Sequence, residues 1–93
     1  MIRSFRGKRT AAIFSGYAVR GLSSQLQQRA REKLLMLDAA NSFDDLRTPP
    51  GNRLEALKGN RKGQHSIRIN DQWRICFVWR LGETWDVEIV DYH

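Results

Sequence analysis

The sequence is poor in cysteine, histidine and proline, and it contains no long run of apolar residues. Of its 93 residues, one is cysteine, two are histidine and two are proline. Cys76 alone cannot form an intramolecular disulfide, and no cysteines and histidines have the spacing of a metal site. The longest apolar stretches fall far short of the roughly 20 residues that span a membrane, and no signal peptide is visible. These absences exclude a disulfide scaffold and a membrane protein, and they predict a single cytoplasmic domain without a metal or cofactor.

Acidic residues are outnumbered by basic ones. The chain has 16 lysines and arginines against 10 aspartates and glutamates, which gives a formal charge of +6. Such a surplus on a small surface attracts polyphosphates or acidic proteins. An anionic partner is therefore expected, and RNA is one candidate.

The first half of the chain predicts a short strand and two helices. The segment MIRSF alternates Ile2 and Phe5 with polar residues, as a strand does, and GKRTAAIFSG can form a short helix before Gly16. A long helix is predicted over residues 22–40, capped by a Ser24–Gln27 capping box or alternatively by Ser23. Its apolar residues recur at helical spacing on one face: Leu22, Leu26, Ala30, Leu34 and Leu37.

The second half predicts a loop followed by three antiparallel strands. Prolines and glycines between residues 41 and 63 indicate a loop with one helical turn near residues 43–46. Beyond it, alternation with a period of two predicts strands in residues 65–69, 73–80 and 85–92. The expected fold class is α+β, a small antiparallel sheet packed on one long and one short N-terminal helix. The residues expected on the covered face of the sheet include three tryptophans, which we interpret as core: Ile67, Ile69, Trp73, Ile75, Phe77, Trp79, Trp85, Val87 and Ile89.

The pairing of the strands follows from the requirement that opposed residues share a face. A loop at residues 70–72 pairs Arg68 with Arg74. In the second hairpin, Trp79 lies opposite either Trp85 or Val87, which places Arg74 opposite Val90 or Tyr92 respectively. In both cases Arg74 lies beside the last residues of the sequence. Cys76 shares the outward face, where packing explains it better than a catalytic thiol does.

Two adjacent arginines on an open face repel each other, and an anionic ligand would remove the repulsion. Arg68 and Arg74 are therefore interpreted as a phosphate clamp. The alternative is that they point apart into water or pair with Asp86 and Glu88.

The loop LKGNRKGQH adds further candidates for RNA binding. Lys58, Arg61, Lys62 and His65 lie in it, together with glycines that let the backbone approach a ligand. A solvated basic loop explains the same run of charges.

The sequence ends in Asp91, Tyr92 and His93. An imidazole can exchange protons near neutral pH, a carboxylate can orient it, and a tyrosine ring can stack on a base. The expected proximity of this triplet to Arg74 makes it a candidate catalytic group.

With these motifs in place, the sequence resembles the HigB toxins of the RelE/ParE superfamily. The resemblance rests on MIRSFRGK, on LEALKGNRKGQHSIRINDQWRICFVW and on the closing DYH. It implies one toxin domain over residues 1–93 with a microbial-RNase-like fold, and a ribosome-dependent endoribonuclease that cuts messenger RNA without a metal. It also implies a HigA-type helix-turn-helix antitoxin as partner, through which alone the toxin reaches operator DNA.

The resemblance assigns catalytic roles to five residues. Lys58 matches the lysine of the family's LKG motif, Arg74 the arginine after the tryptophan, and Asp91, Tyr92 and His93 the terminal triplet. Glu55 stands where some family members have histidine, so a scheme with two histidines does not apply; Glu55 could accept a proton or hold Lys58.

Two other functions remain open at this point. A ParE-like toxin shares the scaffold but inhibits DNA gyrase, and it should tolerate loss of the DYH triplet. A non-catalytic RNA-binding protein predicts salt-sensitive binding without cleavage of the message.

Overall fold

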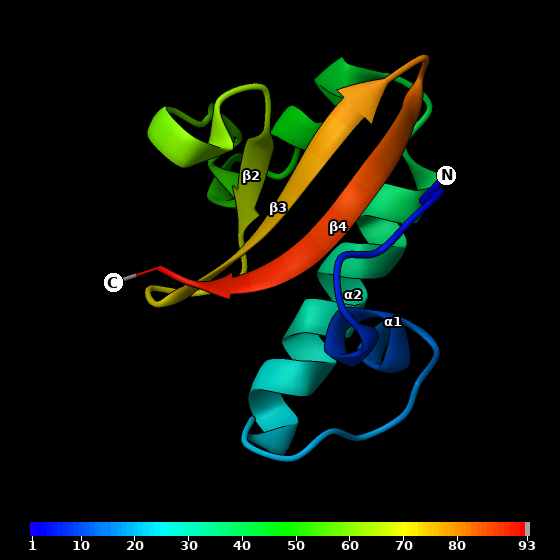
Figure 1. The fold of residues 1–93 in the computed structure, drawn as a ribbon, viewed down its shortest axis with the longest axis vertical. Helices are drawn as coiled ribbons and strands as arrows, with labels where there is room; N and C mark the ends of the chain where they lie inside the picture. Colours follow the sequence, from blue (N-terminus) through cyan, green and yellow to red (C-terminus); the bar gives the residue numbers. More distant parts are fainter. Residues whose placement is uncertain (93) are drawn as a thin grey trace.

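The chain forms two helices that pack on one face of a four-stranded antiparallel sheet (Figure 1). This computed structural model describes residues 1–92. The strand order is β1-β2-β3-β4, and the α+β class expected from the sequence is confirmed. The elements in chain order are α1 (Lys8–Phe14), α2 (Ser24–Ala39), the 3-10 turns η1 (Phe43–Arg47) and η2 (Pro50–Asn52), β1 (Glu55–Ala56), the 3-10 turn η3 (Gly59–Arg61), β2 (His65–Arg68), β3 (Trp73–Arg80) and β4 (Glu83–Asp91).

Helix α2 supplies the helical side of the core. Its N-cap is Ser23, whose hydroxyl accepts a hydrogen bond from the Leu26 amide at 3.1 Å. The predicted Ser24–Gln27 capping box is therefore wrong. The side-chain amide of Gln27 instead forms hydrogen bonds with the backbone of Val19 and with the Leu22 carbonyl. The predicted apolar face is confirmed, with four of its five residues buried: Leu26, Ala30, Leu34 and Leu37.

The covered face of the sheet meets α2 through Ile67, Ile75 and Phe77, none of which exposes any surface. Burial of each such side chain contributes about 1.5–3 kcal/mol to folding. This core fixes the sheet against the helix, and it leaves the opposite face of β2 and β3 available for polar residues.

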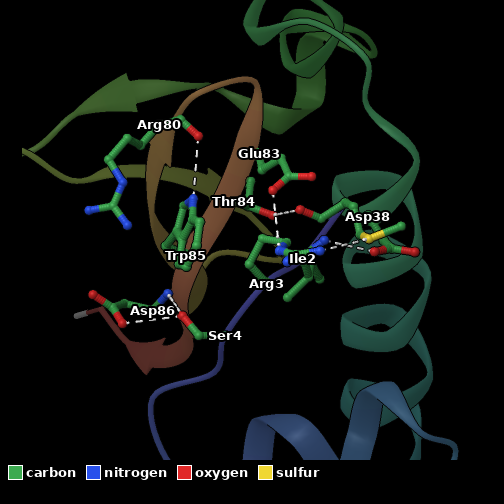
Figure 2. Close-up of polar contacts among 10 residues, drawn as sticks. Ile2, Arg3, Ser4, Asp38, Arg80, Glu83, Thr84, Trp85 and Asp86 are labelled. Carbon is green, nitrogen blue, oxygen red and sulfur yellow. Dashed lines mark hydrogen bonds and ion pairs between the residues drawn. The ribbon is translucent and has the colours of Figure 1, made fainter.

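The N-terminal segment forms less regular structure than expected. Ile2 and Phe5 make isolated parallel bridges to Thr84 and Val87 of β4 rather than a strand of their own. Figure 2 shows how polar contacts hold this segment: the Ile2 amide donates to the Asp38 carboxylate at 2.8 Å, and Arg3 pairs with Glu83 at 3.2 Å. The predicted short strand is thus replaced by two bridges.

The second half of the chain forms one strand more than the three predicted there. Glu55 and Ala56 form β1, which pairs with Ser66 and His65 of β2. Two residues are too few to show an alternating pattern, so this strand could not be predicted. Its presence brings the segment around Glu55 alongside β2.

A β-bulge divides the β3–β4 pairing into two halves. Cys76 pairs with Glu88, but Val78 pairs with Trp85, and Asp86 in the bulge has φ 54°. The extra residue reverses which face the following side chains occupy. The prediction that Trp85 is a core residue is therefore wrong. Thr84 is buried in its place.

On the outer side, Trp85 stacks under Arg80, whose guanidinium carbon lies 4.4 Å from the ring centre. Figure 2 also shows the Ser4 hydroxyl accepting a hydrogen bond from the Asp86 amide, at 2.8 Å. These contacts hold the bulge in place.

No helix within residues 1–92 is both long enough and apolar enough to cross a membrane.

Candidate functional site

The candidate site is a polar depression at the end of the sheet where β2 turns into β3. The predicted register is confirmed here: Arg68 pairs with Arg74, and Arg74 pairs with Val90 of β4. Arg74 thus has the partner expected from the first of the two pairings, but Trp79 lies opposite Thr84 rather than Trp85, because the bulge shifts the register. The depression has a volume of about 330 Å³, and it is lined by Arg53, Glu55, Arg68, Asn70, Asp71, Arg74 and Tyr92.

Arg74 is the most firmly held cation of the site, with only 11% of its side chain exposed. Its Nε donates to the Ser66 hydroxyl at 2.7 Å, and its Nη2 donates to the Arg53 carbonyl at 2.6 Å. No group within residues 1–92 accepts a hydrogen bond from Nη1. A guanidinium fixed in this way offers the remaining N–H groups to an anion without further ordering.

The sequence predicts that Arg68 and Arg74 repel each other on an open face. In the structure, each guanidinium is instead compensated by a carboxylate. Arg68 turns to Asp71, with which it forms an ion pair and hydrogen bond, and the Arg74 Nη2 lies 3.6 Å from the Glu55 carboxylate. The side chains therefore point apart, as in the alternative interpretation, but their partners are not Asp86 and Glu88. An incoming phosphate would compete with two carboxylates.

Arg53 is a site residue that the sequence analysis missed. It has φ 45° and ψ 55°, the left-handed conformation, and this directs its carbonyl to Arg74. The buried Asn52 supports it by donating to the Leu46 carbonyl at 3.1 Å and accepting from the Lys33 ammonium at 2.5 Å. No sequence pattern reliably predicts an arginine in the left-handed conformation after such a turn. The position of Arg53 is therefore known only from the structure of η2 and β1.

Tyr92 and Asp91 leave the end of β4 in different directions. Tyr92 lines the depression with Arg74 and exposes 41% of its surface, and its amide donates to the Gln72 carbonyl at 2.6 Å. Asp91 pairs with Trp73, so it belongs to the other face, where its carboxylate accepts from the Gln72 amide at 3.2 Å. The third member of the triplet, His93, lies outside the described residues.

The basic loop is only partly directed at the site. Lys58 directly precedes η3 and is exposed, but it does not line the depression. Arg61 pairs with Glu88 at 3.2 Å and with Gln64, so its charge is already compensated. Lys62 is exposed at the end of η3.

His65 lies on the opposite face of the sheet from Arg74. It pairs with the buried Phe77, and its ring contacts Phe43 edge to face with centroids 4.7 Å apart. Its buried Nδ1 has no hydrogen-bond partner within residues 1–92, and burial lowers the pKa of the imidazole. The prediction that His65 shares an RNA surface with Arg68 does not agree with this position.

Cys76 is fully buried on the outer face of the sheet, beneath the Arg61–Glu88 pair. Burial raises the pKa of its thiol, which keeps the sulfur protonated and unreactive. Packing therefore accounts for this residue.

The depression thus combines a fixed guanidinium, two further arginines, two carboxylates and an exposed tyrosine. Such a set can bind a phosphate diester, stabilise added negative charge on it and stack a neighbouring base. Within residues 1–92, no cluster of three or more histidine, cysteine, aspartate or glutamate side chains is arranged to hold a metal ion.

Comparison with known proteins gives a family match over almost the whole chain. Residues 3–93 match the family model described as the RelE-like toxin of the type II toxin–antitoxin system HigB.

Two relatives illustrate the range of similarity. Toxin HigB-1 of Vibrio cholerae serotype O1 is 50% identical over 58 residues, which cover 62% of this chain and 61% of that protein. The protein named Endoribonuclease HigB of Proteus vulgaris is 31% identical over 93 residues and covers both chains completely.

A solved structure has the same fold. A chain of the YoeB–YefM complex from Staphylococcus aureus superposes with a TM-score of 0.61 and 16% sequence identity, covering 100% of this chain and 98% of the other. At this level of identity the likeness concerns the arrangement of helices and strands alone.

Proposed function

The chain belongs to the HigB-like family of RelE-like toxins of type II toxin–antitoxin systems, and on this basis we propose that it is an endoribonuclease that cuts messenger RNA on the ribosome. The observation that carries the proposal is the depression in which Arg74 and Tyr92 lie together. The full-length similarity to a protein named Endoribonuclease HigB supports it.

RNA supplies its own nucleophile, the 2′-hydroxyl, so the enzyme has to make three catalytic contributions. The hydroxyl must lose its proton, the phosphorane must be stabilised, and the leaving 5′-oxygen must gain a proton. Side chains can provide all three, and we therefore propose a metal-independent reaction.

Arg74 is assigned to the phosphorane because its position is fixed by Ser66 and by the Arg53 carbonyl. Arg68 is placed to hold a neighbouring phosphate once it exchanges Asp71 for the substrate. The phosphate would displace weak partners, since exposed ion pairs contribute only about 0–1 kcal/mol. Tyr92 is assigned to stacking on or orienting a base.

Proton transfer is assigned to His93, with Asp91 in support, as the family resemblance implies. Tyr92, the residue before His93 in the chain, lines the depression. Lys58 is the second electrostatic group of the proposal. It lies at the exposed start of η3 and would have to extend toward the substrate.

We further propose that the ribosome presents the message to this site. The depression is built from one end of a single sheet, so the protein by itself encloses little of an RNA strand. A scaffold that holds the message in a defined path would supply the missing orientation. The proposed partner that controls the toxin is a HigA-type antitoxin with a helix-turn-helix domain.

The test is cleavage of a defined message in a translating extract and, in parallel, of the same RNA without ribosomes. Cleavage that requires ribosomes and persists when EDTA is added at a level that spares them supports the proposal. An intact message in the translating extract would refute the nuclease, and cleavage of free RNA at the same rate would refute ribosome dependence.

A further inference from the structure

The turn that carries Arg53 into the candidate site is anchored to helix α2. Asn52, the last residue of η2, is fully buried. Its side-chain Nδ2 donates to the Leu46 carbonyl at 3.1 Å and to the Thr48 carbonyl at 3.3 Å, and its Oδ1 accepts from the Lys33 ammonium at 2.5 Å. Both polar atoms of this side chain are therefore used to hold the turn, and one of them connects it to the helix.

Arg53 has a backbone conformation that its surroundings must enforce. Its φ of 45° and ψ of 55° are left-handed. Residues other than glycine are uncommon in this region and persist there only where neighbouring contacts hold them. The Arg53 amide donates to the Pro50 carbonyl at 3.1 Å, and the contacts of the preceding Asn52 fix the turn itself. The Arg53 carbonyl is thereby directed to Nη2 of Arg74, at 2.6 Å.

The Arg74 guanidinium is held by two contacts of different origin. Ser66, which accepts from Nε at 2.7 Å, is a buried residue of β2, the strand that pairs with β3. The Arg53 contact comes from outside the sheet, through the turn that Lys33 anchors on α2. Loss of that anchor should leave the Ser66 contact in place and release the other, so that the guanidinium is no longer fixed in one orientation.

Stability alone does not explain a lysine at position 33. Burial lowers the pKa of its ammonium, and the charge of Arg29, one turn earlier on α2, lowers it further. Within residues 1–92 the ammonium forms no ion pair. A desolvated cation beside a second cation is unfavourable on a helix, whereas a methionine would fill a similar space without a charge. The contact that the lysine makes possible is the one with Asn52.

We propose that Lys33 is a positioning residue for the cleavage reaction, which acts on the Arg74 guanidinium without contacting the RNA. Its ammonium holds Asn52, and Asn52 holds the turn that presents the Arg53 carbonyl to Arg74. The inference rests on the proposed nuclease function and adds to it a residue of the helical layer. Small displacements of a catalytic group, on the order of 1 Å, can lower a rate by about 100-fold, so a contact this far from the phosphate can influence the chemical step.

The test is single-turnover cleavage of a defined message on programmed ribosomes, measured as a function of toxin concentration. Lys33→Met removes the ammonium and should lower the maximal cleavage rate by about ten- to 100-fold, with the half-saturating toxin concentration unchanged. Lys33→Arg keeps a charged donor and should restore most of the rate. The matched control is Arg31→Met, which removes an exposed cation from a different face of the same helix and should cleave like the parent protein.

A double-mutant comparison tests whether Lys33 acts through Arg74. In the Arg74→Ala background, Lys33→Met should change the remaining rate by less than about twofold, because the group that it positions is absent. An effect as large as that in the parent protein would overturn the proposal. A raised half-saturating concentration with an unchanged maximal rate would overturn it as well, because Lys33 would then be an RNA-binding residue.

Crystal structures of the parent protein and of Lys33→Met give a readout that does not depend on cleavage. The variant should lose the hydrogen bond between the Arg53 carbonyl and Arg74 and keep the one to Ser66; an unchanged Arg53 contact contradicts the proposal, as does a parental cleavage rate in the folded variant. Circular dichroism reports folding, and Lys33→Ala replaces Lys33→Met if the latter does not fold. If the parent protein leaves the message intact, the proposed function fails, whereas the crystallographic comparison still tests the link from Lys33 to Arg74.

Discussion

Arg68 and Arg74 are directly paired across β2 and β3, yet their guanidinium groups turn away from each other. Arg68 turns to Asp71 at the hairpin, and Arg74 turns across β2 to Ser66 and the Arg53 carbonyl. The backbone register brings the charges together, and local acceptors keep them apart. Arg74 is thereby held in position before a substrate arrives, whereas Arg68 has to exchange Asp71 for the substrate.

Arg74 should be indispensable for cleavage. We expect Arg74→Ala to reduce message cleavage in a translating extract by about 100- to 1,000-fold, because a positioned electrostatic donor is lost. Arg74→Lys should also be severely impaired, since an ammonium cannot reproduce the planar fork that contacts both Ser66 and Arg53.

The matched control is Arg47→Ala, which removes an exposed arginine that pairs with Asp44 outside the site. It should cleave at the parent rate. Cleavage by folded Arg74→Ala at the rate of this control would disprove the role given to Arg74.

Deletion of His93 tests proton transfer. We expect the deletion to lower the rate of the chemical step by about 100- to 10,000-fold, the usual contribution of a general acid or base. Ribosome binding should be preserved, because the basic surface is intact. If cells expressing the truncated protein still die, with replication arrested before translation, the gyrase-directed alternative becomes the better explanation.

His65 should make the stability of the fold depend on pH. Burial lowers the pKa of this imidazole in the folded state, below the ordinary value of about 6.5 that it has in the unfolded chain. The unfolded state therefore binds protons more readily, and stability should fall as the pH decreases through about 6.5 toward the folded pKa. Urea unfolding between pH 8 and pH 5 measures this loss. His65→Phe retains an aromatic ring and should reduce the decline; an equally steep decline in this variant would exclude His65 as its source.

The tip of the β3–β4 hairpin offers a gain in stability. Leu81 has φ 56° and is 89% exposed, and Gly82 follows with φ 76°. A leucine in the left-handed region costs about 1–2 kcal/mol, whereas asparagine is tolerated there. Leu81→Asn should therefore stabilise the protein by about 1 kcal/mol and raise Tm by roughly 4–8 °C. Leu81→Ala, which keeps a Cβ without the asparagine amide, should gain little; equal stabilisation by both variants would rule out the backbone explanation.

The sequence predicted those parts of the fold in which a repeating pattern reflects burial. The steps of three and four along α2 predicted the buried face of the helix, and the alternation in β2 and β3 with the loop at residues 70–72 was sufficient to place Arg68 opposite Arg74. The prediction for Trp85 was wrong because one extra residue near Asp86 shifts the alternation without changing the apolar pattern.

Residues that depend on irregular backbone could not be predicted in the same way. Arg53 enters the site through a left-handed conformation, and Glu55 through a strand of two residues. His65 belonged to a run of basic residues in the sequence, but strand pairing with Phe77 directs it into the aromatic cluster. Tertiary contacts set these positions.

The bulge at Asp86 separates the two ends of the longest hairpin. On one side, the pairs from Cys76 with Glu88 to Trp73 with Asp91 fix the strand ends at the depression; on the other, the pairs from Val78 to Arg80 close the turn. If the length or sequence of that turn changes, the β3–β4 pairing can adjust at the bulge. The pairs between the bulge and the depression then keep their register. The protein can therefore remodel its distal tip while the geometry around Arg74 stays constant, which makes the tip a suitable place to graft a label or a short peptide.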